Sequence, residues 1–197
     1  DTLDETVDFI FELTNFNKEI KFNITNFIDE KNSKAVVISS SLCITALEQS
    51  VNSKYSSRII GAALYPGFSD VKGVELSRTK FTSQENYEKV KILFESCGKN
   101  VYSVTDRPGM ISLRIVTMII NEAYLVLQEG TSNKEDIDTA MKLGTNYPYG
   151  PIEWSERLGV DLVYNILKTM SDEFGDDRYR ITPLLKEKYL ETLKVSS

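Results

Sequence analysis

The sequence predicts an α/β N-terminal part followed by an all-α C-terminal part. In the first half, short apolar runs rich in β-branched residues alternate with stretches whose apolar residues recur at helical spacing. Such alternation is typical of βαβ units with a parallel sheet. In the second half, after Pro108-Gly109, the apolar residues of 111–129 recur without an internal Gly or Pro. We therefore place a domain boundary at residue 105 and expect domains at 1–105 and 106–197.

The first half contains five predicted strands and three predicted helices. The strands are expected at Val7–Leu13, Ala35–Ser39, Arg58–Leu64, Gly73–Ser77 and Asn100–Val104, and the helices at 17–29, 44–50 and 82–96. The β-branched run Ala35–Ser39 (AVVIS) indicates a strand buried on both faces. Thr82 and Glu85 have the spacing of a capping box, and Gly98 is the expected stop of that helix.

The second half is predicted to be helical throughout. Helices are expected at 111–129, at 132–144 with Ser132 as the cap, at 161–174, and from Thr182-Pro183 onward. The apolar residues of 111–129 lie on more than one side of the helix, so we expect burial on several sides. A helix this apolar would not face water alone, which predicts a homodimer formed through the helical domain.

The composition excludes several classes of protein. The formal charge is −6, and the Lys and Arg residues form no run, which argues against nucleic-acid binding. No apolar run approaches the roughly 20 residues that cross a bilayer, so no membrane association is expected. The two cysteines are too few for a disulfide framework, which predicts a reduced, cytoplasmic setting. The acidic start lacks Met and does not resemble a signal peptide, so we expect a processed or shortened chain.

The chain contains no histidine. Histidine is the usual general base near neutral pH and the commonest metal ligand, so Ser-His-Asp triads and HExxH zinc sites are excluded in their ordinary forms. No metal site is expected. The acidic residues Asp172, Glu173, Asp176 and Asp177 have two interpretations, a solvated helix end or a loose Ca²⁺ site, and their spacing is not that of an EF-hand.

Four segments of the second half carry a family resemblance. They are Asp106–Gly109 (DRPG), Asn121–Ala123 (NEA), Asn133–Gly144 (NKEDIDTAMKLG) and Tyr147–Pro151 (YPYGP). In order, spacing and residue type they resemble the C-terminal domain of the NAD-dependent L-3-hydroxyacyl-CoA dehydrogenases. The resemblance implies a helical dimerisation domain like the C-terminal domain of 6-phosphogluconate dehydrogenase. It also implies that the first half is a partial Rossmann-like, NAD-binding-like domain.

The strand-to-helix turn at Ser39–Thr45 (SSSLCIT) resembles the "NTSSL-IT" turn of that family. The resemblance implies that Ser40 binds the substrate near the nicotinamide. An alternative interpretation is purely structural, with Ser41 as the cap of the next helix. Replacing such a cap by Ala lowers stability by about 1 kcal/mol. Both interpretations stay open at the level of sequence.

The stretch Arg58–Gly67 (RIIGAALYPG) resembles the family's "RVIG-HFFNP" segment. The resemblance places Ala63 where the family has its catalytic His and Pro66 near a family Asn. Glu75 matches the family carboxylate that orients the His, so the chain has kept the orienting group and lost the base. The alternative for Glu75 is a solvated carboxylate at a strand edge. A further family Asn corresponds to Leu113, next to a retained Arg114.

The family binds NAD through a GxGxxG turn that the resemblance places before Asp1. Gly61, Gly67 and Gly73 are spaced too widely to cradle a pyrophosphate. Glu12 matches a family Glu at a strand end and is a weak candidate for cofactor binding.

These observations support three hypotheses. The first is a part of a 3-hydroxyacyl-CoA dehydrogenase-like protein whose dinucleotide-binding half lies outside this sequence or on another polypeptide, so that this chain is inactive by itself, a pseudoenzyme in isolation. The second is a non-catalytic relative that dimerises or binds acyl-CoA. The third is another enzyme on the same fold that uses Tyr65, Lys72 or Arg114 as an acid.

Overall fold

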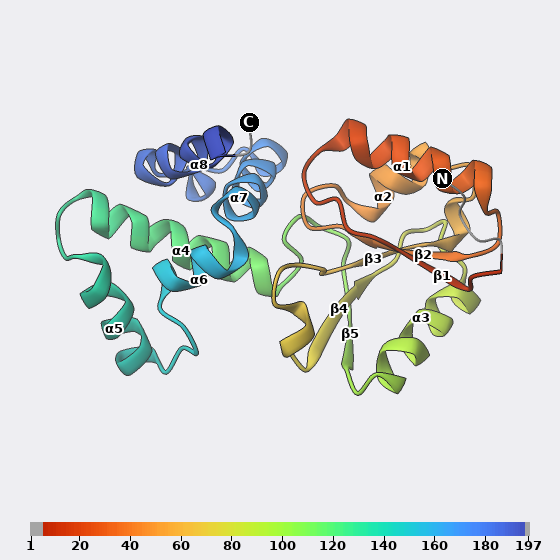
Figure 1. The fold of residues 1–197 in the computed structure, drawn as a ribbon, viewed down its shortest axis with the longest axis horizontal. Helices are drawn as coiled ribbons and strands as arrows, with labels where there is room; N and C mark the ends of the chain where they lie inside the picture. The colour runs from red at the N-terminus through yellow and green to blue at the C-terminus, as the bar shows by residue number, and fades with distance from the viewer. Residues whose placement is uncertain (1–5, 196–197) are drawn as a thin grey trace. The chain divides into compact units, whose positions relative to one another are not determined.

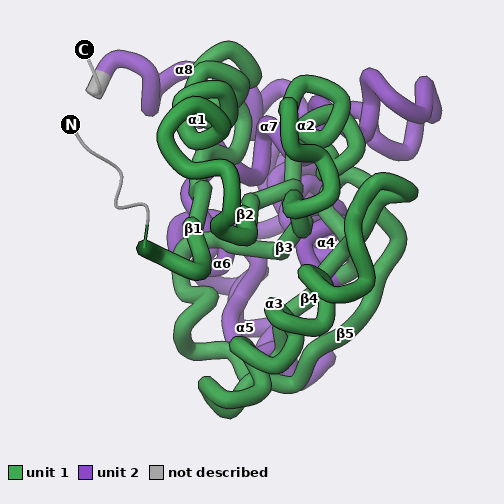
Figure 2. The backbone as a smooth tube through the Cα atoms, turned by 90° about the vertical axis from the view of Figure 1, so that its right-hand side faces the viewer, with its two compact units in different colours: residues 1–111 green, residues 112–197 purple. Residues whose placement is uncertain are grey.

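The computed structural model describes residues 6–195, and the chain divides into two compact units, 1–111 and 112–197 (Figures 1 and 2). The boundary placed at residue 105 from the sequence falls between the last strand of the first unit and the first helix of the second. No helix of the described residues is long and apolar enough to cross a membrane.

Unit 1 contains a five-stranded sheet in the order β1-β2-β3-β4-β5. The strands are β1 (Phe9–Glu12), β2 (Val36–Ser40), β3 (Ile59–Ala62), β4 (Gly73–Ser77) and β5 (Asn100–Val104). All five strands overlap the ranges expected from the sequence. The expectation of a parallel sheet is right for three strand pairs and wrong for β3 and β4, which are antiparallel. The connection 63–72 is too short for the crossover that a parallel pair requires.

Helices cover both faces of the sheet (Figure 1). They are α1 (Lys18–Lys31) and α2 (Ala46–Asn52) on one face and α3 (Gln84–Ser96) on the other. Strand β2 shows why both faces are covered, since all five of its residues are buried. Val36 and Ile38 belong to the apolar cluster that contains Val90 and Phe94 of α3, whereas Val37 packs with Ile28 of α1. This alternation follows from the two-residue period of a strand.

Two helix caps in unit 1 differ from expectation. The side chain of Ser83, not Thr82, caps α3 by accepting a hydrogen bond from Asn86 N. Thr82 has another role, because its hydroxyl accepts from Thr79 N and donates to Ile59 O. The cap of α2 is Thr45, which forms a complete capping box with Glu48.

A buried ion pair ties α1 to the start of β3. Arg58 Nη2 donates to Asp29 Oδ1 at 2.7 Å, and Arg58 Nη1 donates to Ala35 O at 3.0 Å. The other Asp29 oxygen accepts from Ser53 Oγ and Lys54 N. Both charged side chains are almost fully buried. These hydrogen bonds offset the cost of removing the two charges from water.

Unit 2, in its described residues, consists of helices and connecting segments. The helices are α4 (Ser112–Gln128), α5 (Lys134–Thr145), α6 (Pro151–Leu158), α7 (Val160–Phe174) and α8 (Pro183–Val195). Its core contains Ile120 of α4, Ile166 and Met170 of α7, and Leu185 of α8, all fully buried. Helix α4 buries one face, while Ile115 on the opposite face is 56% exposed. The expectation that this helix is buried on several sides is therefore wrong within unit 2, because its buried residues, such as Val116, Ile120 and Ala123, recur at helical spacing along one face.

The motif residues of α5 and the following loop have a structural explanation. Asp138 Oδ1 accepts from Ile152 N at 2.8 Å and Oδ2 accepts from Glu153 N at 3.0 Å, so Asp138 caps the N-terminus of α6. A Cβ at Gly150 would lie 2.2 Å from Asp138 Cβ, so the close approach requires glycine at position 150. The cap of α5 itself is Asn133 rather than the expected Ser132.

We predict that Arg58→Met lowers the free energy of unfolding by about 3–5 kcal/mol, because it leaves Asp29 buried without its cation. Urea denaturation monitored by circular dichroism measures this loss. The control is Lys168→Met, which removes the exposed pair with Asp172 and should change stability by no more than about 0.5 kcal/mol. Equal effects of the two substitutions would contradict the argument from burial.

Candidate reaction-centre pocket

The structure brings Ser40, Ala63 and Glu75 together in unit 1. Ser40 ends β2 and pairs in register with Ala62, the last residue of β3. The next residue, Ala63, donates its backbone N–H to Glu75 O at 3.0 Å. Ser40 and Ala63 thus lie at the carboxyl ends of the parallel neighbours β2 and β3, and the antiparallel strand β4 brings the backbone of Glu75 beside Ala63. Their functional roles stay predictions.

The hydroxyl of Ser40 is fully buried and bonded within the protein. It donates to Asn15 Oδ1 and also lies 3.1 Å from Leu64 O. A ligand can thus bond to Ser40 through the oxygen lone pairs, whereas the hydroxyl proton is already engaged. Ser41 does not cap the next helix as one interpretation expected, because Thr45 is that cap.

Glu75 lies inside the sheet and is not a solvated carboxylate at an edge. Strand β4 is flanked by β3 and β5, and Glu75 is 8% exposed. Its Oε2 accepts a hydrogen bond from Ile111 N at 2.7 Å. The interpretation as a solvated edge residue is therefore wrong. Ala63, where the resemblance places a catalytic His, is 4% exposed and presents only a methyl group.

Tyr65 follows Ala63 by two residues and is half-buried. Burial raises the pKa of its phenol above the ordinary value, and the negative charge of Glu75 raises this pKa further. The phenol is therefore protonated at neutral pH and can donate a hydrogen bond. Of the other acid candidates, Lys72 is exposed, and Arg114 in unit 2 donates to Tyr179 Oη at 2.8 Å.

Glu12 belongs to a separate buried network. It forms an ion pair with Lys21, accepts from Ser39 Oγ at 2.7 Å, and accepts from Thr14 N at 2.8 Å. Lys21 Nζ also donates to Thr14 O at 2.6 Å. Burial lowers the pKa of Lys21, and the neighbouring Glu12 opposes this shift. These contacts give Glu12 a structural role at the end of β1, and its role in cofactor binding stays a prediction.

A pocket of about 510 Å³ is lined by Asn15 and Leu64, the hydrogen-bond partners of the buried Ser40, whereas Ser40, Ala63 and Glu75 are not among its lining residues. One wall is formed by Phe11, Leu13 and Asn15 at the end of β1, and the other by residues 64–69 after β3. Both walls are predominantly apolar. Asn15 was not among the site residues expected from the sequence. Its place shortly after a predicted strand could have indicated it, because ligands of open α/β sheets bind beyond the carboxyl ends of the strands.

The described residues do not form a cradle for a dinucleotide pyrophosphate. Such a cradle needs a glycine turn that leads from a strand into a helix N-terminus. The β1–α1 connection, 13–17, and the β2–α2 connection, 41–45, contain no glycine. The N-terminus of α1 is capped by its own Asn17 side chain. We therefore derive no reaction step through NAD from these residues.

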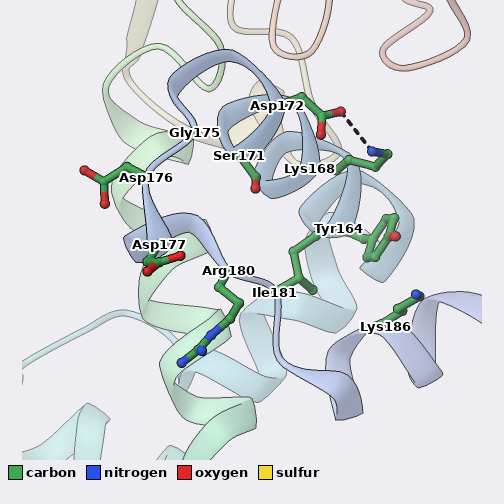
Figure 3. Close-up of a pocket in the computed structure, with 10 residues that line it drawn as sticks. All are labelled: Tyr164, Lys168, Ser171, Asp172, Gly175, Asp176, Asp177, Arg180, Ile181 and Lys186. Carbon is green, nitrogen blue, oxygen red and sulfur yellow. Dashed lines mark hydrogen bonds and ion pairs between the residues drawn. The ribbon is translucent and has the colours of Figure 1, made fainter.

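A second, polar pocket of about 410 Å³ lies in unit 2 between α7 and α8 (Figure 3). Three residues of the acidic cluster border it, but they do not converge on one point. Asp172 pairs with Lys168, and Asp176 pairs with Arg178 and points away from the pocket. Among the described residues there is no group of three acidic or cysteine side chains that could hold a metal ion. The solvated interpretation of this helix end fits these pairings.

Comparison with known proteins agrees with the resemblance seen in the sequence. The model of the family "3-hydroxyacyl-CoA dehydrogenase, C-terminal domain" matches residues 109–194. A 3-hydroxybutyryl-CoA dehydrogenase of Clostridioides difficile is 33% identical over 182 residues, which are 91% of this chain and 64% of that protein. A 3-hydroxyadipyl-CoA dehydrogenase of Escherichia coli is 46% identical over 93 residues, which are 47% of this chain and 20% of that protein.

A solved structure agrees in fold as well. The crystal structure of (S)-3-hydroxybutyryl-CoA dehydrogenase from Ralstonia eutropha is 30% identical, with a TM-score of 0.83 over 93% of this chain and 65% of the other. The fold and these matches define a class of proteins in which a sheet unit is followed by a helical unit, as in the dehydrogenases named above. The chain belongs to the 3-hydroxyacyl-CoA dehydrogenase family. It spans less than two thirds of the length of the relatives named here.

We predict that Glu75→Gln lowers the pKa of the Tyr65 phenol, because the substitution removes the negative charge that opposes ionisation. Burial remains, so this pKa should stay above the ordinary value of 10.0. Ultraviolet pH titration measures the change, and subtracting the titration of Tyr65→Phe isolates the signal. The exposed Glu95→Gln is the control and should leave the Tyr65 titration unchanged. An unchanged titration in Glu75→Gln would show that the carboxylate does not act on Tyr65.

Proposed function

We propose that this chain contributes the substrate-facing sheet and the helical domain of a 3-hydroxyacyl-CoA dehydrogenase-like protein, and that it does not catalyse hydride transfer by itself. The family reaction is the NAD-dependent oxidation of an L-3-hydroxyacyl-CoA to the 3-oxoacyl-CoA. The observation that carries the proposal is the buried methyl group of Ala63, held by its backbone beside Glu75 and Ser40.

The chemistry of the reaction explains why this methyl group matters. As hydride leaves the carbinol carbon, the hydroxyl proton has to pass to a base. The side chain of Ala63 cannot accept a proton, and the loss of a general base typically lowers the rate by about 10²–10⁴-fold. Ser40 cannot replace the base, because a neutral hydroxyl is far too weak a base and its own hydrogen-bond acceptors are amide carbonyl oxygens of Asn15 and Leu64, which cannot take the proton onward. The side-chain carboxylate of Glu75 accepts a hydrogen bond from Ile111 N.

The absent dinucleotide cradle lowers the activity of this chain further. NAD is the cofactor expected for the family, and the residues described here supply no glycine turn for its pyrophosphate. A polypeptide segment outside these residues would have to supply that turn.

The second candidate is a non-catalytic relative that dimerises or binds acyl-CoA. It is favoured by the residues at positions 63, 66 and 113, which are internal and do not depend on where the chain begins. Their side chains are apolar where the resemblance expects His and two Asn residues. A relative that had lost the reaction would still use the sheet unit and the helical unit for binding.

We also propose that unit 2 is a dimerisation domain of the 6-phosphogluconate dehydrogenase C-terminal-like type. Helix α4 and helix α5 form an apolar groove of about 370 Å³ lined by Ile119, Val126, Ile137 and Met141. Ile115 on α4 and Leu143 on α5 are also exposed. A second copy of the chain would remove these side chains from water. Cys43 and Cys97 are not joined in a disulfide, which fits a reducing, cytoplasmic setting.

The chain alone should reduce acetoacetyl-CoA with NADH at less than a thousandth of an ordinary rate of roughly 10 per second. Loss of NADH absorbance measures the rate. Ala63→His should not restore activity on its own, because the dinucleotide cradle is still absent. The control variant is Val51→His, which adds an imidazole at an exposed position away from the candidate site. Turnover above this limit in the unmodified chain, or rescue by Ala63→His alone, would contradict the proposal.

Dimerisation through the α4–α5 groove predicts that Ala140→Glu shifts the chain from dimer to monomer, because a charge would be buried in the apolar interface. Sedimentation velocity measures the shift. Val51→Glu places the same charge on an exposed apolar position of unit 1 and should leave the dimer intact. A monomeric unmodified chain at micromolar concentration would refute this part of the proposal.

A further inference from the structure

We propose that the pocket between the end of β1 and residues 64–69 binds the planar aromatic acyl group of a thioester, with Asn15 as the hydrogen-bond donor to the acyl carbonyl. The identification of the carbonyl compound as a thioester rests on the proposed function. The aromatic preference and the role of Asn15 rest on the pocket itself.

A row of aromatic side chains connects the two walls of this pocket, since Phe11 on one wall and Phe68 on the other both contact the buried Phe94. Phe11 and Phe94 meet edge to face with ring centroids 6.2 Å apart, and Phe94 meets Phe68 at 6.0 Å. Phe68 in turn meets Tyr65 at 6.2 Å, again edge to face. Phe11 is 49% exposed, so the row ends in ring surface that is open to a ligand. A planar aromatic ring can extend such a row in the same edge-to-face or offset geometry.

The wall at residues 64–69 is held in place by Lys99. Its Nζ donates to Phe68 O at 3.1 Å, to Ser69 O at 2.8 Å and to Val71 O at 2.5 Å. The same ammonium group lies 4.8 Å from the centroid of the Phe68 ring. Three carbonyl contacts from one cation fix the turn that carries Phe68, so the aromatic surface is formed before a ligand arrives.

The opposite wall is held by the Glu12–Lys21 pair. Glu12 accepts from Thr14 N, and Lys21 donates to Thr14 O, so both backbone groups of Thr14 are fixed. Asn15 follows directly and is anchored a second time by the hydroxyl of Ser40. Preorganised walls lower the entropic cost of binding, because fewer groups lose freedom when the ligand binds.

Asn15 provides the polar contact. Its Oδ1 accepts from Ser40, and among the described residues its Nδ2 donates to Leu13 O alone, at 3.3 Å. An amide nitrogen carries two N–H donors, so one donor remains for a carbonyl oxygen in the pocket. The lining contains no charged side chain. A neutral carbonyl therefore fits, whereas a carboxylate or phosphate would lose its hydration without a compensating charge.

Two matched ligands test this assignment on the full chain. The first is S-benzoyl-N-acetylcysteamine, an aromatic thioester, and the second is S-benzyl-N-acetylcysteamine, which has a CH₂ group in place of the carbonyl. Ligand-observed NMR titration measures both affinities. The thioester should bind about 5- to 10-fold more tightly, the value of one added hydrogen bond. Asn15→Leu should abolish this preference, and Phe68→Ala should weaken both ligands. Ser171→Ala, in the polar pocket of unit 2, should change neither.

The outcomes separate the pocket from the proposed function. A matched aromatic ketone, 1-phenylbutan-1-one, in which the carbonyl is attached to the ring as in the benzoyl thioester, is titrated in parallel, and circular dichroism verifies that each variant is folded. Binding of the ketone with the same dependence on Asn15, but no binding of the thioester, would support the pocket and refute the thioester function. Equal binding of thioester and thioether in the unmodified chain would overturn the role of Asn15. No binding of any of the three ligands at millimolar concentration would overturn the inference as a whole.

Discussion

The backbone around Ala63 is bonded on both sides, and the arrangement of the candidate site depends on this constraint. Ser41, the residue after β2, donates its backbone N–H to Ala62 O. On the other side, Ala63 donates its backbone N–H to the carbonyl oxygen of Glu75 in β4. These bonds involve no side chain, so position 63 stays between Ser40 and Glu75 whichever residue it carries. A substitution that exchanges a basic side chain for a methyl group at such a position would change the chemistry and leave the backbone geometry intact. The proposed loss of the reaction is for this reason compatible with the family fold.

The polar side chains near Ala63 mainly form hydrogen bonds that hold the protein's own loops and strands in place. Ser40 anchors Asn15, Glu75 accepts from Ile111 N, and the Glu12–Lys21 pair fixes Thr14. Each of these groups keeps a structural reason to persist after a reaction is lost, because removing one would leave a buried partner without its hydrogen bond. Retained polar residues are consequently weak evidence for retained activity. The residue that would move a proton is the better indicator.

The sequence predicted the strands closely, since β-branched runs such as Val36–Ser40 carry a local signal. The expectation that Ser40, Ala63 and Glu75 lie together came from the family resemblance alone, because no local pattern in the sequence relates these three positions. The sequence did not predict the antiparallel β3–β4 pair, which depends on the length of a loop rather than on the strands. Lys99 was missed because its three carbonyl partners lie about 30 residues earlier in the chain, and no local pattern marks such a contact.

The strongest family signal and the chemistry of the site lie in different residues. The "EDID" and "YPYGP" segments are particular because Asp138 caps α6 and because only glycine fits at position 150 beside it. These are requirements of helix packing in unit 2, and they hold whether or not a reaction takes place. In the proposed function the positions that decide the reaction are few, and they are those at which the resemblance expects other side chains. Family membership is therefore evidence for the fold, while function follows from the side chains that line the pocket.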